Sequence, residues 1–166
     1  PIFSPDGQSI LYWAADDSLL QRVAAGGGMP VTLAKIDNPL GLSWGPDGRV
    51  LVGAGPKGVL GVPARGGSAQ TLVKMAAGEA ARDPQMLPDG DTVLFTLADG
   101  TPANWNQARI VAQSVKTGQR TMIEPGRDAR YLPSGRLVYV SGSTLMAVAF
   151  DAKRLATSGE PVAIAD

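Results

Sequence analysis

The side chains that could do chemistry in this sequence are carboxylates, hydroxyls, guanidinium groups and a few aromatic rings, because its 166 residues include no His and no Cys. Without His, the sequence lacks the usual general base, the commonest transition-metal ligand and any Ser-His-Asp triad. Without Cys, it has no disulfide, thiolate nucleophile or Cys-type zinc site. A calcium loop of the D-x-D-x-D-G kind is also absent. The sequence therefore predicts no metal site and no cofactor.

Two short motifs match catalytic or cofactor-binding patterns, but their surroundings argue against both. Gly41–Gly45 fits the G-x-S-x-G nucleophile elbow, which needs a strand-to-helix turn and a His base, whereas a Pro-Asp-Gly turn follows it directly. Gly53–Gly58 fits G-x-G-x-x-G, which needs a helix opening at the third Gly to hold a pyrophosphate. The Val59–Pro63 segment after it is too short and broken for that helix. We therefore predict no catalytic or cofactor-binding residue at either motif.

Acid-base catalysis would need carboxylates that converge in the fold. Five aspartates stand in predicted loops or at strand ends, namely Asp16, Asp17, Asp83, Asp99 and Asp128. Nothing in their spacing selects a pair. The sequence therefore favours a non-catalytic protein, and the alternative is a hydrolase, or a domain that gates one.

Two Arg-Asp dipeptides, Arg82-Asp83 and Arg127-Asp128, stand 45 residues apart. Their repetition indicates either ion pairs that brace the fold or a surface that faces a ligand. Trp105 lies in the longest predicted loop, where an aromatic ring can anchor a ligand or partner or pack over a sheet edge. These five residues are the candidate binding site for a protein, peptide or small molecule.

The elements that must position these residues are set by a repeat. Pro-Asp-Gly begins at residues 5, 46 and 88, and the variant Pro-Ser-Gly begins at residue 133, which gives spacings of 41, 42 and 45. A short apolar or aromatic stretch precedes each tripeptide, and a β-rich run such as Thr92–Thr96 or Leu137–Val140 follows it. Pro pre-sets φ for the first turn position, and Gly supplies the positive φ that closes a short loop. Each tripeptide is therefore predicted to be a hairpin tip.

A second turn follows about twenty residues later in each unit, between two more strand-like runs. It is Gly26–Gly28, Gly66–Gly67 and Thr117–Gly118 in the first three units, and a longer excursion from Asp151 to Gly159 in the fourth. The 21 Gly and 13 Pro interrupt nearly every window long enough for a helix, which argues against a helical repeat.

Four strands in each of four units, with roughly 42 residues per unit, match the blades of a β-propeller. The predicted fold is all-β, a β-propeller region of four-stranded antiparallel blades that occupies residues 1–166. The expected blades are residues 1–38, 39–81, 82–126 and 127–166.

Several of these segments resemble a known family. Phe3–Ile10, Trp44–Val50 and Leu87–Val93 are similar to the repeats of TolB-type, WD-repeat-like β-propellers, and the likeness covers the whole chain. Ala129–Tyr139 is similar to propeller regions that follow bacterial serine/threonine kinase domains, although no kinase motif is present. The resemblance implies a bacterial binding scaffold, sensor or gating domain, in a periplasmic or cell-surface location.

The resemblance also implies rings with more than four blades. The expectation is therefore a partial propeller, which is either a piece of a longer protein or a half-ring of which two copies close one eight-bladed ring; four blades closed on themselves are the other possibility. A purely structural arc completed by a second copy is the further alternative for the function. The hairpin tips are expected at one rim of the arc. The irregular connections, which include Asp16-Asp17 and Gly53–Lys57, are expected at the opposite rim, where binding usually resides.

Charge and hydropathy exclude two classes of partner. Lys and Arg together number 15, as do Asp and Glu, so no net positive charge favours a nucleic acid or an anionic membrane. No apolar run approaches the roughly 18 residues of a membrane span. The partner is therefore expected to be a protein, peptide or small-molecule ligand at the loop rim, with self-association as a further possibility.

Overall fold

Sixteen strands in four antiparallel sheets make up the computed structural model, which describes residues 1–100 and 103–165. Blade 1 contains β1 (Ile2–Phe3), β2 (Ser9–Ala14), β3 (Leu19–Ala24) and β4 (Val31–Lys35). Blade 2 contains β5 (Leu42–Trp44), β6 (Arg49–Gly53), β7 (Val59–Pro63) and β8 (Gln70–Val73). Blade 3 contains β9 (Glu79–Met86), β10 (Thr92–Asp99), β11 (Arg109–Ser114) and β12 (Arg120–Pro125), with a 3₁₀ turn, η1 (Trp105–Gln107), before β11. Blade 4 contains β13 (Arg127–Leu132), β14 (Arg136–Ser141), β15 (Thr144–Asp151) and β16 (Ala156–Ala165).

The repeated tripeptides form the tip between the first two strands of each blade. Gly7, Gly48, Gly90 and Gly135 have φ of 69°, 74°, 70° and 78°, and each amide donates to the carbonyl three residues earlier. In the first tip, Asp6 Oδ1 accepts from the Gln8 amide at 3.0 Å. The tip aspartates are therefore structural, as the turn chemistry predicts.

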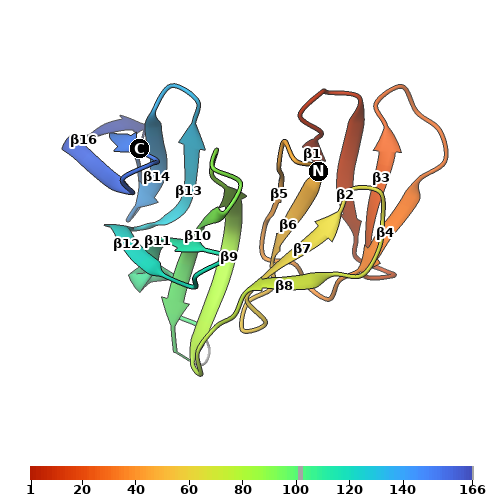
Figure 1. Ribbon diagram of the computed structural model, residues 1–166, viewed down its shortest axis with the longest axis horizontal. Helices are drawn as coiled ribbons and strands as arrows, with labels where there is room; N and C mark the ends of the chain where they lie inside the picture. The colour runs from red at the N-terminus through yellow and green to blue at the C-terminus, as the bar shows by residue number, and fades with distance from the viewer. Residues whose placement is uncertain (101–102, 166) are drawn as a thin grey trace.

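Apolar side chains from adjacent blades form three core clusters, because alternate residues of each strand point to opposite faces of the sheet. The cluster between blades 1 and 2 includes Leu11, Leu20 and Val52. The cluster between blades 2 and 3 includes Leu51, Val59 and Phe95. The cluster between blades 3 and 4 includes Leu94, Ile110 and Leu137. The first strand of each blade is the innermost in the arc (Figure 1). Residues of β1, β5, β9 and β13 line a common central cavity of about 300 Å³, so the first strands of all four blades face the centre of the arc.

Hydrogen bonds between turns confirm the predicted division into two rims. At the first rim, which we call the turn rim, the Ala64 amide donates to the Gly48 carbonyl at 2.9 Å and so joins the two turns of blade 2. At the opposite rim, the loop rim, the Gly100 amide donates to the Gly78 carbonyl, also at 2.9 Å. The irregular connections therefore gather at one edge of the scaffold.

The fourth blade differs from its sequence-based description. The expected excursion from Asp151 to Gly159 is a tight turn, and β16 already begins at Ala156. Asp151 Oδ1 accepts from the amides of Lys153 and Arg154 at 2.9 and 3.1 Å, and Leu155 takes a φ of 53°. The side-chain hydrogen bonds and the one left-handed residue close the hairpin without Gly.

Blade 3 begins earlier than expected, since β9 starts at Glu79, within the segment assigned to the second blade.

Among residues 1–100 and 103–165 there is no helix that could span a bilayer.

Candidate functional site

The two Arg-Asp dipeptides occupy equivalent bulges in the innermost strands of blades 3 and 4. Asp83 and Asp128 each stand five residues before the Pro of the following tip, with φ of 50° and 58°. At both positions the pairing with the second strand shifts, so two residues oppose one. Gly41 occupies the same position in blade 2, with φ of 93°. The repeat thus places a left-handed residue at the loop-rim side of three inner strands, and in blades 3 and 4 that residue stands in a bulge.

One guanidinium joins the two bulges. Arg82 Nε lies 2.6 Å from Asp83 Oδ2 in its own blade, and Arg82 Nη2 lies 3.0 Å from Asp128 Oδ1 in blade 4. The second contact is ionic without the alignment of a hydrogen bond. Arg127 Nη1 binds the other oxygen of Asp128 at 2.6 Å. The four residues therefore form one ion-pair network across the boundary between blades 3 and 4.

Arg130 belongs to the same network, although the sequence reasoning missed it. Its Nη1 donates to the Asp83 carbonyl at 2.9 Å, and its Nη2 lies 3.8 Å from Asp83 Oδ1. With Arg82 and Arg127, it supplies three positive charges against the negative charges of Asp83 and Asp128. The network therefore has a surplus of positive charge.

Trp105 lies against this network. It begins η1, where the Asn104 side chain accepts from the Asn106 amide at 3.2 Å and caps the turn. The guanidinium carbon of Arg82 lies 5.1 Å from the centre of the Trp105 ring, which is a cation–π distance. The ring is only half-buried. All five candidate residues named from the sequence thus come together at the loop rim.

A pocket of about 230 Å³ opens beside the ring, lined by Trp105, Asn106, Arg127 and Gly142 among others. Arg127 Nη2 makes a long hydrogen bond, 3.3 Å, to the Gly142 carbonyl within it. The pocket therefore combines the aromatic face of Trp105 with the Arg127 guanidinium, whose Nη2 makes only this long hydrogen bond.

The two carboxyls of the network differ in acidity. Burial, followed by a hydrogen bond with Asp128, raises the pKa of Asp83 above its ordinary value despite the Arg82 guanidinium. Burial alone would raise the pKa of Asp128 too, but the hydrogen bond with Asp83 and the guanidiniums of Arg127 and Arg82 lower it. Asp83 is therefore the weaker acid of the two.

Asp128→Asn is expected to lower the free energy of unfolding at pH 7 by about 1 kcal/mol more than Asp83→Asn, since the folded structure stabilises the charge of Asp128 and disfavours that of Asp83. The stability from the lowered pKa of Asp128 is present above its unfolded pKa of about 4 and is lost as pH falls through its folded pKa. The raised pKa of Asp83 contributes stability below about pH 4 that is lost as pH rises through its folded pKa. Urea unfolding from pH 7 to 3 measures both, and the difference should shrink on acidification. Equal losses at pH 7 would contradict this assignment.

The other candidate carboxylates do not join this pair. Asp99 binds Arg109 at 2.7 Å, and Asp16 and Asp17 are exposed in the β2–β3 turn of blade 1. Within residues 1–100 and 103–165, no group of three or more acidic side chains could hold a metal ion.

The two motif matches lie in strand-turn-strand segments. Ser43 lies in β5, which leads through the tip at Pro46 into β6. Gly53–Gly58 connects β6 to β7, and Gly55 pairs with Ala81 of blade 3. The helix that each chemistry requires is missing from both segments.

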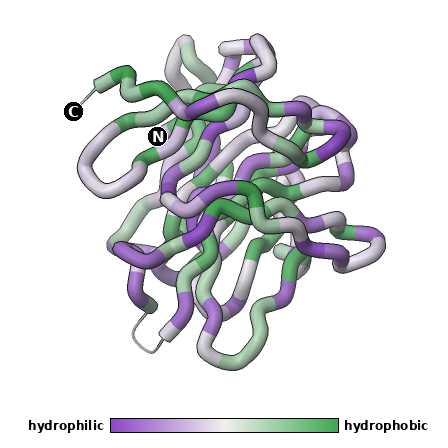
Figure 2. Tube along the Cα trace, turned by 90° about the vertical axis from the view of Figure 1, so that its left-hand side faces the viewer, coloured by the Kyte–Doolittle hydropathy of each residue, from purple (hydrophilic) through white to green (hydrophobic). Residues whose placement is uncertain are grey.

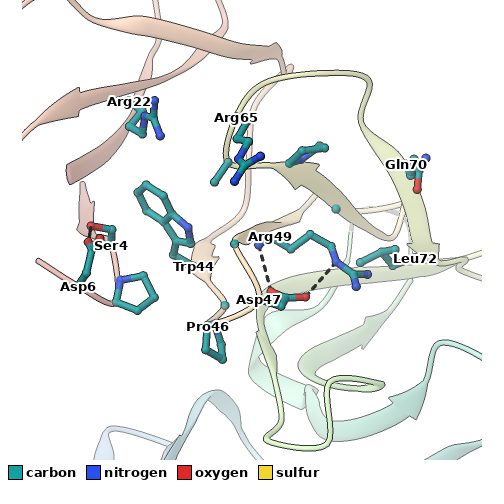
Figure 3. Close-up of a pocket in the computed structure, with 16 residues that line it drawn as sticks. Ser4, Asp6, Arg22, Trp44, Pro46, Asp47, Arg49, Arg65, Gln70 and Leu72 are labelled. Atoms are coloured by element: carbon teal, nitrogen blue, oxygen red, sulfur yellow. Dashed lines mark hydrogen bonds and ion pairs between the residues drawn. The ribbon is translucent and has the colours of Figure 1, made fainter. Parts of the chain in front are cut away.

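A larger cleft, of about 810 Å³, lies at the turn rim between blades 1 and 2, and the sequence reasoning missed it. Figure 3 draws the Trp44 ring among the side chains that line this cleft, together with Arg22, from β3, and Arg65, from the β7–β8 turn. Arg49 is paired with Asp47 at 3.0 Å, whereas Arg22 and Arg65 have no ion-pair partner among the described residues. Only spatial proximity reveals this cleft, since its arginines occupy ordinary strand and turn positions.

No protein-family model and no curated protein matches the sequence. Solved structures do match: a protein described as TolB from Agrobacterium tumefaciens (TM-score 0.72, 18% identity, 100% of this chain and 61% of that chain) and a chain of the nidogen/laminin complex (TM-score 0.73, 13% identity, 99% and 63%). A third is the calcium-binding protein regucalcin from Agrobacterium tumefaciens (TM-score 0.69, 17% identity, 98% and 57%).

These identities establish the fold alone. The chain spans about three fifths of the length of each of these proteins. The predicted all-β architecture of four-stranded propeller blades, with a TolB-like arrangement, is confirmed, and the chain is an arc of four such blades.

Proposed function

We propose that this chain is a non-catalytic binding module of a larger bacterial protein, and that its loop rim binds a carboxylate-bearing group of a protein, peptide or small molecule. The observation that carries the proposal is the convergence of Arg82, Asp83, Trp105, Arg127 and Asp128 beside one pocket. The resemblance to TolB-type propellers supports an extracytoplasmic location for this module.

The chemistry of the pocket favours an anionic ligand group. Arg127 is held by Asp128 through Nη1, while Nη2 makes only the 3.3 Å bond to a neutral carbonyl. A ligand carboxylate at Nη2 would replace that bond by a shorter, charge-assisted one. The Trp105 ring, fixed by Arg82, offers a flat apolar surface for the rest of the ligand. Arg82, Asp83 and Asp128 therefore position the two residues that contact the ligand.

The test uses benzoate and a hexaglutamate peptide as probes, and follows the indole N–H signal of Trp105 by NMR, assigned with Trp105→Phe. Both probes are expected to shift that signal. Arg127→Gln should weaken binding about tenfold, the equivalent of about 1.4 kcal/mol, because one charge-assisted pair is lost. If no probe shifts the Trp105 signal, or if Arg127→Gln binds as the parent does, the proposal fails.

Two controls separate this pocket from the rest of the surface. Arg136→Gln removes an exposed arginine of blade 4 that has no ion-pair partner among the described residues, and should leave binding unchanged. Arg22→Gln tests the turn-rim cleft of Figure 3. If Arg22→Gln weakens binding and Arg127→Gln does not, the ligand binds in that cleft. Activity of the purified chain on ester, glycoside or peptide substrates would favour the hydrolase alternative.

A further inference from the structure

Arg22 lines the turn-rim cleft from a position where other blades have very small residues. By its pairing with the second strand, Arg22 of β3 corresponds to Gly61 of β7 and to Ala112 of β11. Its side chain points toward blade 2, because Leu20, two residues earlier, belongs to the core cluster between blades 1 and 2. Figure 2 shows hydrophobic stretches along the strands and many hydrophilic ones at the turns, so an arginine inside a strand that faces the next blade departs from the general pattern. The fold therefore does not require an arginine at this position.

Arg65, in the β7–β8 turn, departs from the repeat in the same way. This turn of blade 2 repeats the β3–β4 turn of blade 1, since the amides of Ala64 and Ala25 both donate to a carbonyl in the tip of their own blade, at 2.9 and 2.8 Å. Arg65, the residue after Ala64, therefore stands where blade 1 has Gly26. Each of the two arginines thus replaces a glycine of the other blade.

Three donor groups of the cleft have no acceptor within the protein. Arg22 is half-buried and Arg65 is exposed, and among residues 1–100 and 103–165 neither forms an ion pair or a side-chain hydrogen bond. The indole N–H of Trp44 also has no acceptor in this part of the chain, whereas that of Trp13 donates to the Ile36 carbonyl at 2.9 Å. Trp44 Nε1 is not among the buried unpaired atoms, so solvent reaches it. A ligand in the cleft therefore finds two guanidinium groups and one N–H free to donate.

Two carboxylates also line the cleft, but both are engaged in the hairpin tips. Asp6 accepts hydrogen bonds from a hydroxyl and an amide of its own tip, at 2.5 and 3.0 Å. Asp47 pairs with Arg49 at 3.0 Å, so these two charges offset each other. Of the remaining charges, the two unpaired arginines outweigh Asp6. The cleft therefore has a surplus of positive charge and favours an anionic ligand.

We propose that the turn-rim cleft is a second binding site, separate from the loop rim, for a phosphate monoester carried on a planar aromatic group. A phosphate monoester has three terminal oxygens and a charge of about −1.5 to −2 at pH 7. Arg22, Arg65 and the Trp44 N–H each donate to one of these oxygens, whereas a carboxylate has only two. Guanidinium groups match phosphate in geometry as well as in charge.

The Trp44 ring and the size of the cleft account for the aromatic part of the ligand. The ring packs against the core cluster between blades 1 and 2 but is only half-buried, so the rest of its surface lies at the cleft (Figure 3). A planar group stacks on such a surface. The cleft volume of about 810 Å³ leaves room for a ligand larger than phosphate itself.

The test follows the indole N–H signal of Trp44 by NMR. The signal is assigned with Trp44→Phe, a change that introduces the residue found as Phe3 at the equivalent position of blade 1. Phenyl phosphate is the probe, and benzoate is its matched control because it has the same ring and a carboxylate. Phenyl phosphate is expected to shift the Trp44 signal with a Kd about tenfold below those of benzoate and of inorganic phosphate. The signal of Trp13, whose N–H is already bonded, should stay in place.

Two variants separate loss of binding from loss of folding, because each introduces a residue that another blade has at the same position. Arg22→Ala introduces the residue of blade 3, and Arg65→Gly introduces that of blade 1. Each should weaken the binding of phenyl phosphate about tenfold while the urea midpoint stays close to that of the parent. Arg136→Gln, which removes an exposed arginine of blade 4, should leave binding unchanged.

Two further ligands distinguish the source of the phosphate. AMP represents free nucleotides, and a peptide with one phosphotyrosine represents a modified protein. Tighter binding of either one than of inorganic phosphate supports the site and identifies its source. The proposal is overturned if phenyl phosphate at about 10 mM leaves the Trp44 signal in place, if benzoate binds equally well, or if both folded variants bind as the parent does. The Trp105 signal reports on the loop rim alone, so failure at either rim is recognised independently of the other.

Discussion

Gly41→Ala is expected to lower the free energy of unfolding by about 3 kcal/mol, the largest single effect we predict. A Cβ at Gly41 would lie 2.8 Å from both the Cα and the amide nitrogen of Asp83, and closer still to the Asp83 carboxylate. The φ of 93° adds a conformational cost for any residue with a Cβ. Because the contact is with backbone of blade 3, rotation of a side chain cannot relieve it.

Gly90→Ala is the matched control, since Gly90 has a φ of 70° but no atom within 4 Å of its Cβ position. It should lose only the conformational cost, about 1 kcal/mol. Urea unfolding followed by fluorescence measures both variants. Equal losses would mean that the approach of blade 2 to blade 3 at Gly41 is looser than the structure has it.

Arg82→Gln is expected to cost about 2 kcal/mol, because it removes the cation that contacts both carboxylates of the loop-rim network. Arg82 contacts Asp83 and Asp128 and also packs over the Trp105 ring. Without it, the two carboxylates face each other while partly buried, with side-chain exposures of 16% and 27%. Stability at pH 7, measured by urea unfolding, should therefore fall and should partly recover on acidification, as the pair takes up protons.

Two comparisons test the cause. Arg82→Gln combined with Asp83→Asn and Asp128→Asn removes the repulsion and should be more stable at pH 7 than Arg82→Gln alone. Arg154→Gln breaks a pair 3.8 Å long in which the Arg154 side chain is 85% exposed, so it should change stability by less than about 0.5 kcal/mol. If Arg82→Gln is as mild as Arg154→Gln, the network does not stabilise the junction of blades 3 and 4.

The blades could be predicted from the sequence because their signals are local. A Pro-Asp-Gly tip fixes φ at two positions and places a capping carboxylate, and all of these interactions lie within about six residues of chain. In the strand that follows each tip, apolar and polar residues alternate or all residues are apolar, and this pattern predicts whether one face or both faces of the strand are buried. Where a turn is closed without Gly, as at Leu155, the local signal is absent and the boundary of β16 was wrong by several residues.

The candidate site was foreseen only in its parts. The 45-residue spacing of Arg82-Asp83 and Arg127-Asp128 identified the two dipeptides as equivalent positions. It did not predict that Arg82 reaches Asp128. Counting five residues back from each tip Pro would also have aligned Gly41 with Asp83 and Asp128. No comparable signal marks Arg130, because its contacts with Asp83 are made between blades.

The sequence by itself determined the repeat, the antiparallel four-stranded blade and the separation of tips from irregular loops, because turn chemistry and side-chain alternation act over a few residues. Only the tertiary structure decided which charges share a network, where Trp105 lies, and that the turn-rim cleft exists. Those outcomes depend on the distance and angle between blades, which are set by the packing of Leu51, Phe95, Leu94 and Leu137 in the cores between sheets. Residues far apart in the chain meet at the loop rim because these apolar faces bring their blades together.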